Sequence, residues 1–195
     1  GANRAASLTH RLLAFSRRQS LQARDLQLND LVVSLQELLA RTLGESVRLE
    51  IDLCAELPQA YVDENQLESA LINLAINARD AMPDGGQLRI ATRQLQVEDQ
   101  PLELGRGIAL APGNYVVVSV ADTGTGMPAD VLERVFEPFY RAADAPPGGS
   151  GLGLAIVSEI ARAHGAHWRL QSRPDFAGTR VGLVFPGPRI GARLN

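Results

Sequence analysis

Hydrophobic residues recur at helical spacing, every three or four positions, in three stretches of residues 25–195. One stretch follows Asn29, a residue type common at helix N-caps, and ends at Gly44. A longer one covers residues 63–82, and another covers residues 152–164. Each has an apolar side and a polar side, so the pattern predicts three amphipathic helices that cover one side of a core.

Between these helices the period of the hydrophobic pattern falls to two. Residues 47–53 alternate apolar and charged or polar side chains, as in a strand with one buried face. Further strands are predicted at residues 87–96, 115–121, 168–172 and 179–185. Residues 97–114 contain two prolines and three glycines, so we predict a surface loop there. Together these elements predict an α+β fold, a two-layer α/β sandwich with helices on one face of a sheet.

The first residues differ in composition from the rest. Residues 1–24 contain five arginines and no acidic residue, whereas acidic residues begin at Asp25. A narrow apolar stripe at spacings of three and four is typical of a helix that packs against another helix, and it consists of Ala5, Leu8, Leu12 and Phe15. We therefore predict two parts. Residues 1–24 form a single bundle helix, one member of a helical hairpin, and residues 25–195 form a separate domain.

Composition narrows the classes of function. The chain has 195 residues, 45% of them hydrophobic, and a net charge of -3, which gives no attraction to nucleic acid or anionic lipid. All 19 basic residues are arginine, so a P-loop lysine and a Schiff-base lysine are excluded. Cys54 is the single cysteine, which excludes an intrachain disulfide and suits a reducing compartment. No uncharged apolar run approaches 18 residues, so we expect a cytoplasmic chain without direct membrane contact, in a parent that an anchor elsewhere can hold at a membrane.

Two motifs place polar side chains where a ligand could meet them. Asn73, Asn77 and Asp80 share one face of the second helix, because they are spaced four and three residues apart. Taken alone, three polar residues at this spacing are more often a solvated helix face than a ligand site. A predicted strand then leads into the segment from Asp122 to Gly126, where the glycines let the backbone approach a flat ligand and the aspartate can accept a hydrogen bond. Taken alone, this segment is equally consistent with a turn.

A third motif opens the last predicted helix. Residues 148–154 read Gly-Gly-Ser-Gly-Leu-Gly-Leu, and N–H groups at a glycine-rich helix start bind phosphate well. The motif is not a dinucleotide fingerprint, because no βαβ unit surrounds it. In chain order, the first motif supplies carboxamide oxygens that can bind Mg²⁺, the second a carboxylate that can accept a hydrogen bond from a nucleobase, and the third glycines that can hold phosphates. The combination predicts a nucleotide site.

In this order the motifs resemble those of the catalytic, ATP-binding domain of bacterial sensor histidine kinases, within the superfamily that includes gyrase, the ninety-kilodalton heat-shock chaperones and MutL. Residues 73–81 resemble the asparagine box, 122–126 the first glycine box, 136–139 the phenylalanine box and 149–154 the second glycine box. The likeness covers about residues 25–187 and implies the Bergerat ATP-binding fold with a mixed sheet. Residues 8–21 are similar to the end of the second helix of the family's dimerisation and phosphotransfer domain.

The resemblance implies ATP and Mg²⁺ as ligands. It implies that Asn77 binds Mg²⁺ with Asn73 beside it, that Asp122 accepts the adenine amino group, and that residues 141–150 form a lid with Arg141 as its cation. The other nucleotide contacts that it implies are Asp80, Gly124, Gly126, Phe136, Gly149, Gly151, Leu152, Gly153 and Thr179. Asn73, Asn77 and Arg141 are the residues that it implies in catalysis.

The implied reaction is transfer of the ATP γ-phosphate to a histidine and then to an aspartate of a response-regulator receiver domain, in a homodimer joined through the helical hairpin. Asn73 stands where hydrolytic members of the superfamily carry a glutamate, and a carboxamide cannot act as a general base, so transfer is favoured over hydrolysis. His10 precedes Arg11 instead of an acid, and His164 and His167 lie at a helix end, so we predict that the acceptor histidine is not in this chain. Two alternatives stay open: a nucleotide-sensing module without transfer, and a serine kinase of the anti-sigma-factor type.

Overall fold

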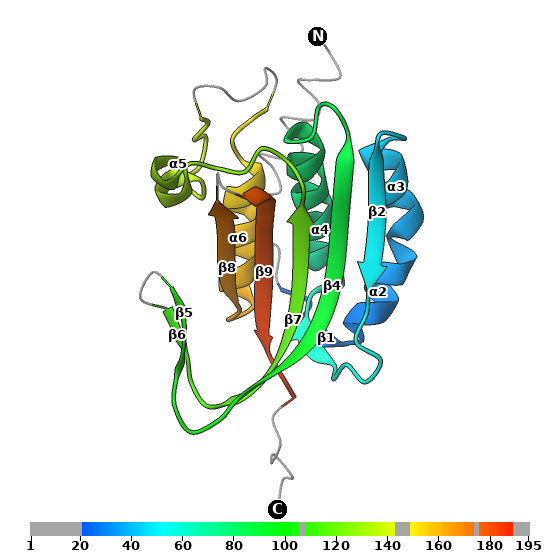
Figure 1. Ribbon diagram of the computed structural model, residues 1–195. Coiled ribbons are helices and arrows are strands. Elements are labelled where there is room, and N and C mark those ends of the chain that lie inside the picture. Colours follow the sequence, from blue (N-terminus) through cyan, green and yellow to red (C-terminus); the bar gives the residue numbers. More distant parts are fainter. Residues whose placement is uncertain (1–20, 106–107, 143–148, 174–175, 189–195) are drawn as a thin grey trace, which may run out of the picture.

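The computed structural model describes residues 21–105, 108–142, 149–173 and 176–188, and a five-stranded sheet forms its centre (Figure 1). The sheet order is β2-β4-β7-β9-β8, with β2 (Val47–Asp52), β4 (Gly86–Val97), β7 (Gly113–Asp122), β8 (His167–Arg173) and β9 (Phe176–Pro186). Strand β2 is parallel to β4, and the other neighbours are antiparallel. The sheet is therefore mixed, as the family resemblance implies.

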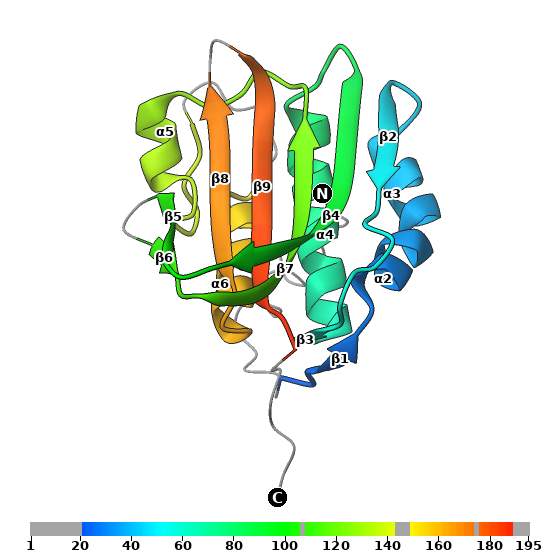
Figure 2. The ribbon, with the colours of Figure 1, turned by 60° about the horizontal axis from the view of Figure 1, so that its bottom comes forward.

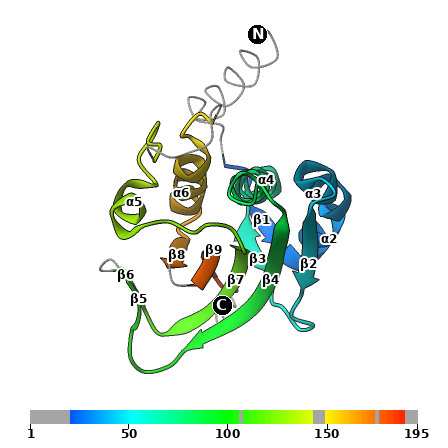
Figure 3. The ribbon, with the colours of Figure 1, turned by 45° about the horizontal axis from the view of Figure 1, so that its top comes forward.

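Helices cover one face of this sheet (Figure 3). They are α2 (Leu28–Ser34), α3 (Gln36–Leu43), α4 (Glu64–Asp80) and α6 (Gly153–Ala163), and the short helix α5 (Ala129–Arg134) lies beside β8. Buried leucines of α4 and α6 pack with inward-facing strand residues such as Ile90, Val118 and Phe185 in the core. This arrangement confirms the predicted two-layer sandwich. The bundle helix predicted in residues 1–24 lies largely outside the described residues.

The first predicted helix starts earlier than expected and is divided in two. Its N-cap residue is Gln27, not Asn29, and the division falls at Leu35. The Asn29 amide nitrogen donates to the Cys54 carbonyl oxygen at 2.8 Å, and its oxygen accepts from the Thr92 hydroxyl at 2.7 Å. Because the Thr92 hydroxyl is fully buried and needs a partner, Asn29 connects β4 to the segment that follows β2 instead of capping a helix.

The prediction of a surface loop at residues 97–114 is wrong, because this segment holds the hairpin of β5 (Leu102–Gly105) and β6 (Ile108–Leu110). Figure 2 shows the end of β4 and the start of β7 crossing in front of β9 and β8, with the hairpin beside β8. Leu110 is fully buried and packs with Val184 in a second, smaller hydrophobic cluster. This burial stabilises the hairpin.

A hydrogen-bonded junction forms where α4 begins. Asp63 is the N-cap residue, and its carboxylate accepts from the N–H of Gln66 at 3.2 Å and from that of Gln22 at 2.9 Å. The Asp63 N–H in turn donates to Nε2 of His164 at 2.9 Å. His164 is the C-cap residue of α6, with Nδ1 2.7 Å from the Ile160 carbonyl oxygen, which confirms its expected place at a helix end. Strand β1 (Arg24–Leu26) pairs with β3 (Ala60–Val62) beside this junction, and the predicted domain boundary at residue 25 falls within β1.

We expect Asp63→Ala to lower the free energy of unfolding by about 1 to 2 kcal/mol, because the helix loses its cap and the Gln22 N–H loses its acceptor. Asp63→Asn retains a side-chain oxygen and should lose less. Denaturant titration followed by circular dichroism measures both changes. Asp99→Ala, at an exposed position, is the matched control. If Asp63→Ala unfolds at the same denaturant concentration as the control, the cap does not contribute to stability.

Candidate functional site

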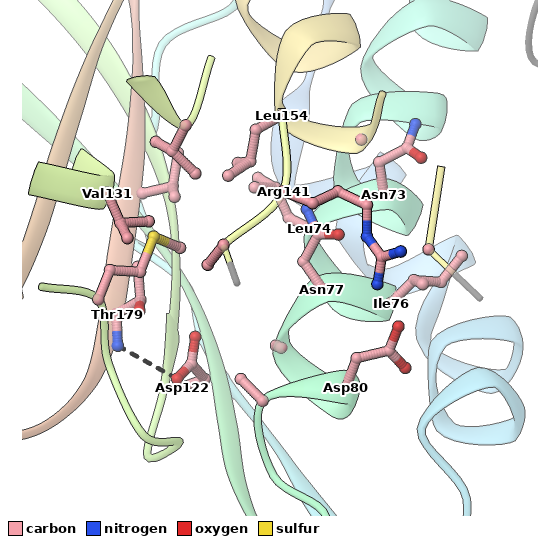
Figure 4. Close-up of a pocket in the computed structure, with 18 of the residues that line it drawn as sticks. Asn73, Leu74, Ile76, Asn77, Asp80, Asp122, Val131, Arg141, Leu154 and Thr179 are labelled. Carbon is pink, nitrogen blue, oxygen red and sulfur yellow. Dashed lines mark hydrogen bonds between the residues drawn. The ribbon is translucent and has the colours of Figure 1, made fainter. Parts of the chain in front are cut away.

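A cavity of about 460 Å³ lies between α4 and α6, next to the ends of β7 and β9 (Figure 4). This volume is typical of small-molecule sites, which span roughly 300–1,000 Å³. The cavity brings together ten residues predicted from the sequence: Asn73, Asn77, Asp80, Asp122, Gly126, Arg141, Gly149, Gly151, Gly153 and Thr179. Three predicted residues do not line it: Gly124, Phe136 and Leu152.

Asp122 is the last residue of β7, and only one of its two carboxylate oxygens accepts hydrogen bonds from the described residues. Its Oδ1 accepts from the backbone N–H of Gly124 at 2.9 Å and from that of Thr179 at 3.1 Å. No hydrogen bond from the described part of the chain reaches Oδ2. Burial raises the pKa of Asp122, and the two N–H donors offset this only in part. The site therefore offers an open acceptor that is poorly hydrated, which suits an N–H donor on a ligand.

Apolar side chains line the cavity around this carboxylate. They include Val120, Met127, Val131, Leu154 and Val181. A wall of this kind can hold a flat aromatic ring, while the carboxylate selects its edge. None of these residues was predicted from the sequence as a ligand contact, although Leu154 ends the second glycine box. Met127 directly follows the first glycine box and could have been found from it, whereas Val131 lies on α5, a helix that no pattern predicted.

Helix α4 presents its polar face to the cavity. Asn73, Asn77 and Asp80 all line it, so they share one face as their spacing predicts. The Asn73 amide nitrogen donates to the Ser69 carbonyl oxygen at 2.8 Å, which holds this side chain along its own helix. A Cβ added at Gly153 would lie 3.0 Å from both Oδ1 and Nδ2 of Asn77. The start of α6 therefore approaches Asn77 closely because residue 153 has no side chain.

The second glycine box forms the wall opposite α4. Gly151 has a φ of 68°, and a Cβ added there would lie 2.7 Å from the Phe139 carbonyl carbon. The Ser150 hydroxyl oxygen lines the same wall, is buried and has no hydrogen-bond partner among the described residues. Gly149 lies next to Arg141, whose guanidinium is on the side of the cavity that carries Asn77 (Figure 4). Most of the expected lid, residues 143–148, lies outside the described residues.

The three predicted residues outside the cavity wall support it from behind. Phe136 stacks on Trp168 of β8 with ring centroids 3.7 Å apart. Leu152 is fully buried at the N-cap of α6. At Gly124, an added Cβ would lie 2.6 Å from the Ala81 carbonyl oxygen, so this glycine lets the first glycine box pack against the end of α4. Direct nucleotide contacts of these residues remain predictions.

Two other features of the described residues bear on the site. They contain no group of three or more histidine, cysteine, aspartate and glutamate side chains placed to hold a metal ion. Within the same residues, no helix is both long and apolar enough to cross a membrane. His167 begins β8 and His164 caps α6.

The layered fold and the cavity define a nucleotide-binding domain of the Bergerat class. A model of the family described as "Histidine kinase-, DNA gyrase B-, and HSP90-like ATPase" matches residues 62–189, and the chain belongs to this family.

Similar proteins narrow the assignment. The sensor kinase CckA of Brucella abortus (strain 2308) is 47% identical over 164 residues, 84% of this chain and 17% of CckA. The alginate biosynthesis sensor protein KinB of Pseudomonas aeruginosa is 32% identical over 189 residues, 94% of this chain and 29% of KinB. The solved structure of the mycobacterial sensor histidine kinase MprB has a TM-score of 0.63 at 28% identity and covers 84% of this chain and 98% of that chain. The chain is thus homologous to the catalytic ATP-binding domains of two-component sensor histidine kinases, and it spans less than a third of the length of the two curated relatives.

Proposed function

We propose that this domain binds Mg²⁺-ATP in the cavity between α4 and α6 and presents the γ-phosphate to a histidine of a dimerisation domain. A response-regulator receiver domain then takes the phosphoryl group. One observation carries the proposal: a single cavity joins Asp122, the Asn73–Asp80 face of α4 and the glycine-rich start of α6. The parent protein, in this proposal, is a homodimer that works in the cytoplasm.

The residues fit the nucleotide. Asp122 offers Oδ2 to the adenine amino group, inside apolar walls. At the other end of the cavity, the start of α6 suits phosphate oxygens, because backbone N–H groups and the helix dipole favour an anion there. The buried Ser150 hydroxyl, which has no partner within the part of the chain that the structure describes, can donate to the same oxygens. Arg141 supplies a positive charge in the same cavity.

Asn77 is the residue that fits Mg²⁺. Its carboxamide oxygen is a hard ligand, and Mg²⁺ keeps several waters and phosphate oxygens, so a single protein ligand suffices. When bound, Mg²⁺ neutralises phosphate charge and orients the γ-phosphate. The close approach of Gly153 holds the Asn77 side chain at the junction of α4 and α6.

The protein's contribution to transfer is positioning and charge neutralisation. Asn73 lines the cavity, yet its carboxamide cannot take a proton from water, so this position favours transfer to an incoming histidine over hydrolysis. Arg141 and the N–H groups of the second glycine box are placed to stabilise charge on the transferred group. The reaction then depends on the orientation of the acceptor relative to the bound nucleotide.

We expect Asn77→Ala to remove the Mg²⁺ dependence of ATP binding. Calorimetric titrations with and without Mg²⁺ give the ratio of the two dissociation constants, and this ratio should fall to about one in the variant because the protein ligand is lost. Asn65→Ala, an exposed position on the same helix, is the control and should retain the wild-type ratio. A wild-type ratio in Asn77→Ala would reject Asn77 as the ligand, and absence of ATP binding by the wild-type chain would reject the proposed function.

A further inference from the structure

Ser172 lies at the meeting point of three segments behind the cavity. It is a residue of β8, is only 7% exposed and belongs to none of the four boxes. Its Oγ accepts from the Met127 N–H at 2.6 Å and donates to the Gly178 carbonyl oxygen at 3.1 Å. It also lies 3.3 Å from Oγ1 of Thr179. A single hydroxyl thus connects the segment after the first glycine box with the start of β9.

These contacts determine how the Thr179 hydroxyl is oriented. A serine hydroxyl has one hydrogen, and in Ser172 this hydrogen points to Gly178. The contact between the two hydroxyl groups is then a hydrogen bond that Thr179 donates to Ser172. With its hydrogen used in this way, the Thr179 oxygen can only accept a further hydrogen bond. Thr179 lines the cavity, and its N–H holds Asp122.

The backbone around Gly178 is tightly packed against the same place. Its φ is 112°, and a Cβ at this position would overlap the carbonyl oxygen of Asp122. Residues 178 and 179 therefore pack directly against the end of β7. The Ser172 hydroxyl connects these two residues to Met127, which lines the cavity. Beside the backbone pairing of β8 with β9, the Ser172 hydroxyl therefore adds side-chain hydrogen bonds that connect these strands to Met127 at this end of the cavity.

We propose that Ser172 is a positioning residue that helps the cavity select one nucleobase over another. By orienting the Thr179 hydroxyl as an acceptor beside Asp122, it gives the cavity two acceptors that suit a purine with an amino group at position 6. A purine with an oxygen at position 6 presents an acceptor to the same two groups and is disfavoured. The inference rests on the proposed function, because it assigns selectivity to the same nucleotide site.

The test compares ATP with inosine triphosphate, which carries an oxygen in place of the amino group. We expect Ser172→Ala to weaken ATP binding by about tenfold, the effect of one buried hydrogen bond, and to leave binding of inosine triphosphate unchanged or slightly tighter. The ratio of the two dissociation constants should therefore fall about tenfold. Ser119→Ala is the matched control, since Ser119 lies on β7 and alternates with the core-facing Val118 and Val120. It should retain the wild-type ratio.

Two further variants separate positioning from stability. Ser172→Thr keeps a hydroxyl and should retain most of the selectivity, and Thr179→Val removes the oriented hydroxyl and should lower the ratio by itself. Combined with Thr179→Val, Ser172→Ala should change the ratio less than it does alone. If Ser172→Ala does not fold, the ratio of the two dissociation constants in Thr179→Val tests the inference instead.

The outcomes for Ser172 and for the proposed function are distinct. If the wild-type chain prefers ATP and Ser172→Ala keeps that preference, or weakens both nucleotides equally, Ser172 is structural and the inference is wrong. The inference is also wrong if Thr179→Val keeps the wild-type ratio of the dissociation constants for ATP and inosine triphosphate. If the wild-type chain binds neither nucleotide, the proposed function fails and the inference fails with it.

Discussion

Asp122→Asn is expected to weaken ATP binding by roughly 10- to 100-fold, the loss of a charge-assisted hydrogen bond worth about 1.5 to 3 kcal/mol. The asparagine oxygen can still accept from the N–H groups of Gly124 and Thr179. Its NH₂ group then replaces Oδ2 and faces the adenine amino group, so two donors meet. Calorimetric titration with ATP and GTP measures the change. Equal affinity of the wild-type chain for ATP and GTP would contradict the role of Asp122.

The same substitution should not destabilise the nucleotide-free domain at neutral pH. Burial raises the pKa of Asp122 above its ordinary value of 3.8, so the folded chain holds this proton more tightly than the unfolded chain does. The stability that comes from protonation is fully present below the ordinary pKa and is lost as the pH rises through the raised folded pKa. At neutral pH the wild-type chain therefore carries a buried charge that Asp122→Asn lacks.

Thermal unfolding at several pH values tests this consequence. The melting temperature of Asp122→Asn should equal or exceed that of the wild-type chain at pH 7, and the difference should shrink as the pH falls through the raised pKa. Asp99→Asn, at an exposed position, controls for the change of net charge. A variant that melts well below the wild-type chain at pH 7 would show that the carboxylate mainly stabilises the fold.

The 195-residue chain is expected to bind ATP without labelling itself from γ-labelled ATP. His164 has both ring nitrogens in contact with backbone groups, at Ile160 and Asp63. Helix α6 begins at the cavity with Gly153 and is 11 residues long, so His164 lies about 16 Å from that end. His167 lies beyond it in β8. His10 lies outside the described residues and lacks the adjacent acid of the family's acceptor pattern.

Labelling should appear when a matching dimerisation domain that carries the acceptor histidine is added. The label should be stable in base and lost in acid, as phosphohistidine is. Acid-labile label on the chain alone would place the acceptor at His10, His164 or His167 and contradict the prediction. Acid-stable label would instead support transfer to serine or threonine.

Local sequence patterns were enough to predict the long helices and strands and the polar face of α4 that lines the site. Helix α4 was predictable because its N-cap Asp63, its apolar stripe and its polar face all lie within one segment, and helical periodicity alone brings Asn73, Asn77 and Asp80 together. Strand β2 was predictable for a similar reason, since apolar and charged residues alternate along it. The order of the motifs then indicated one site.

Tertiary structure decided the features whose partners are distant in sequence. Asn29 bonds to Cys54 and Thr92 instead of capping its helix, because buried polar groups on the strands need partners. The hairpin β5–β6 forms because Leu110 finds apolar neighbours on the sheet, which outweighs the turn-forming prolines and glycines of its segment. Ser172 meets Met127 across 45 positions of sequence, and no local pattern distinguishes it from an ordinary strand serine. Hydrophobic periodicity is a property of a segment, whereas the partner of a buried hydroxyl is a property of the assembled layers.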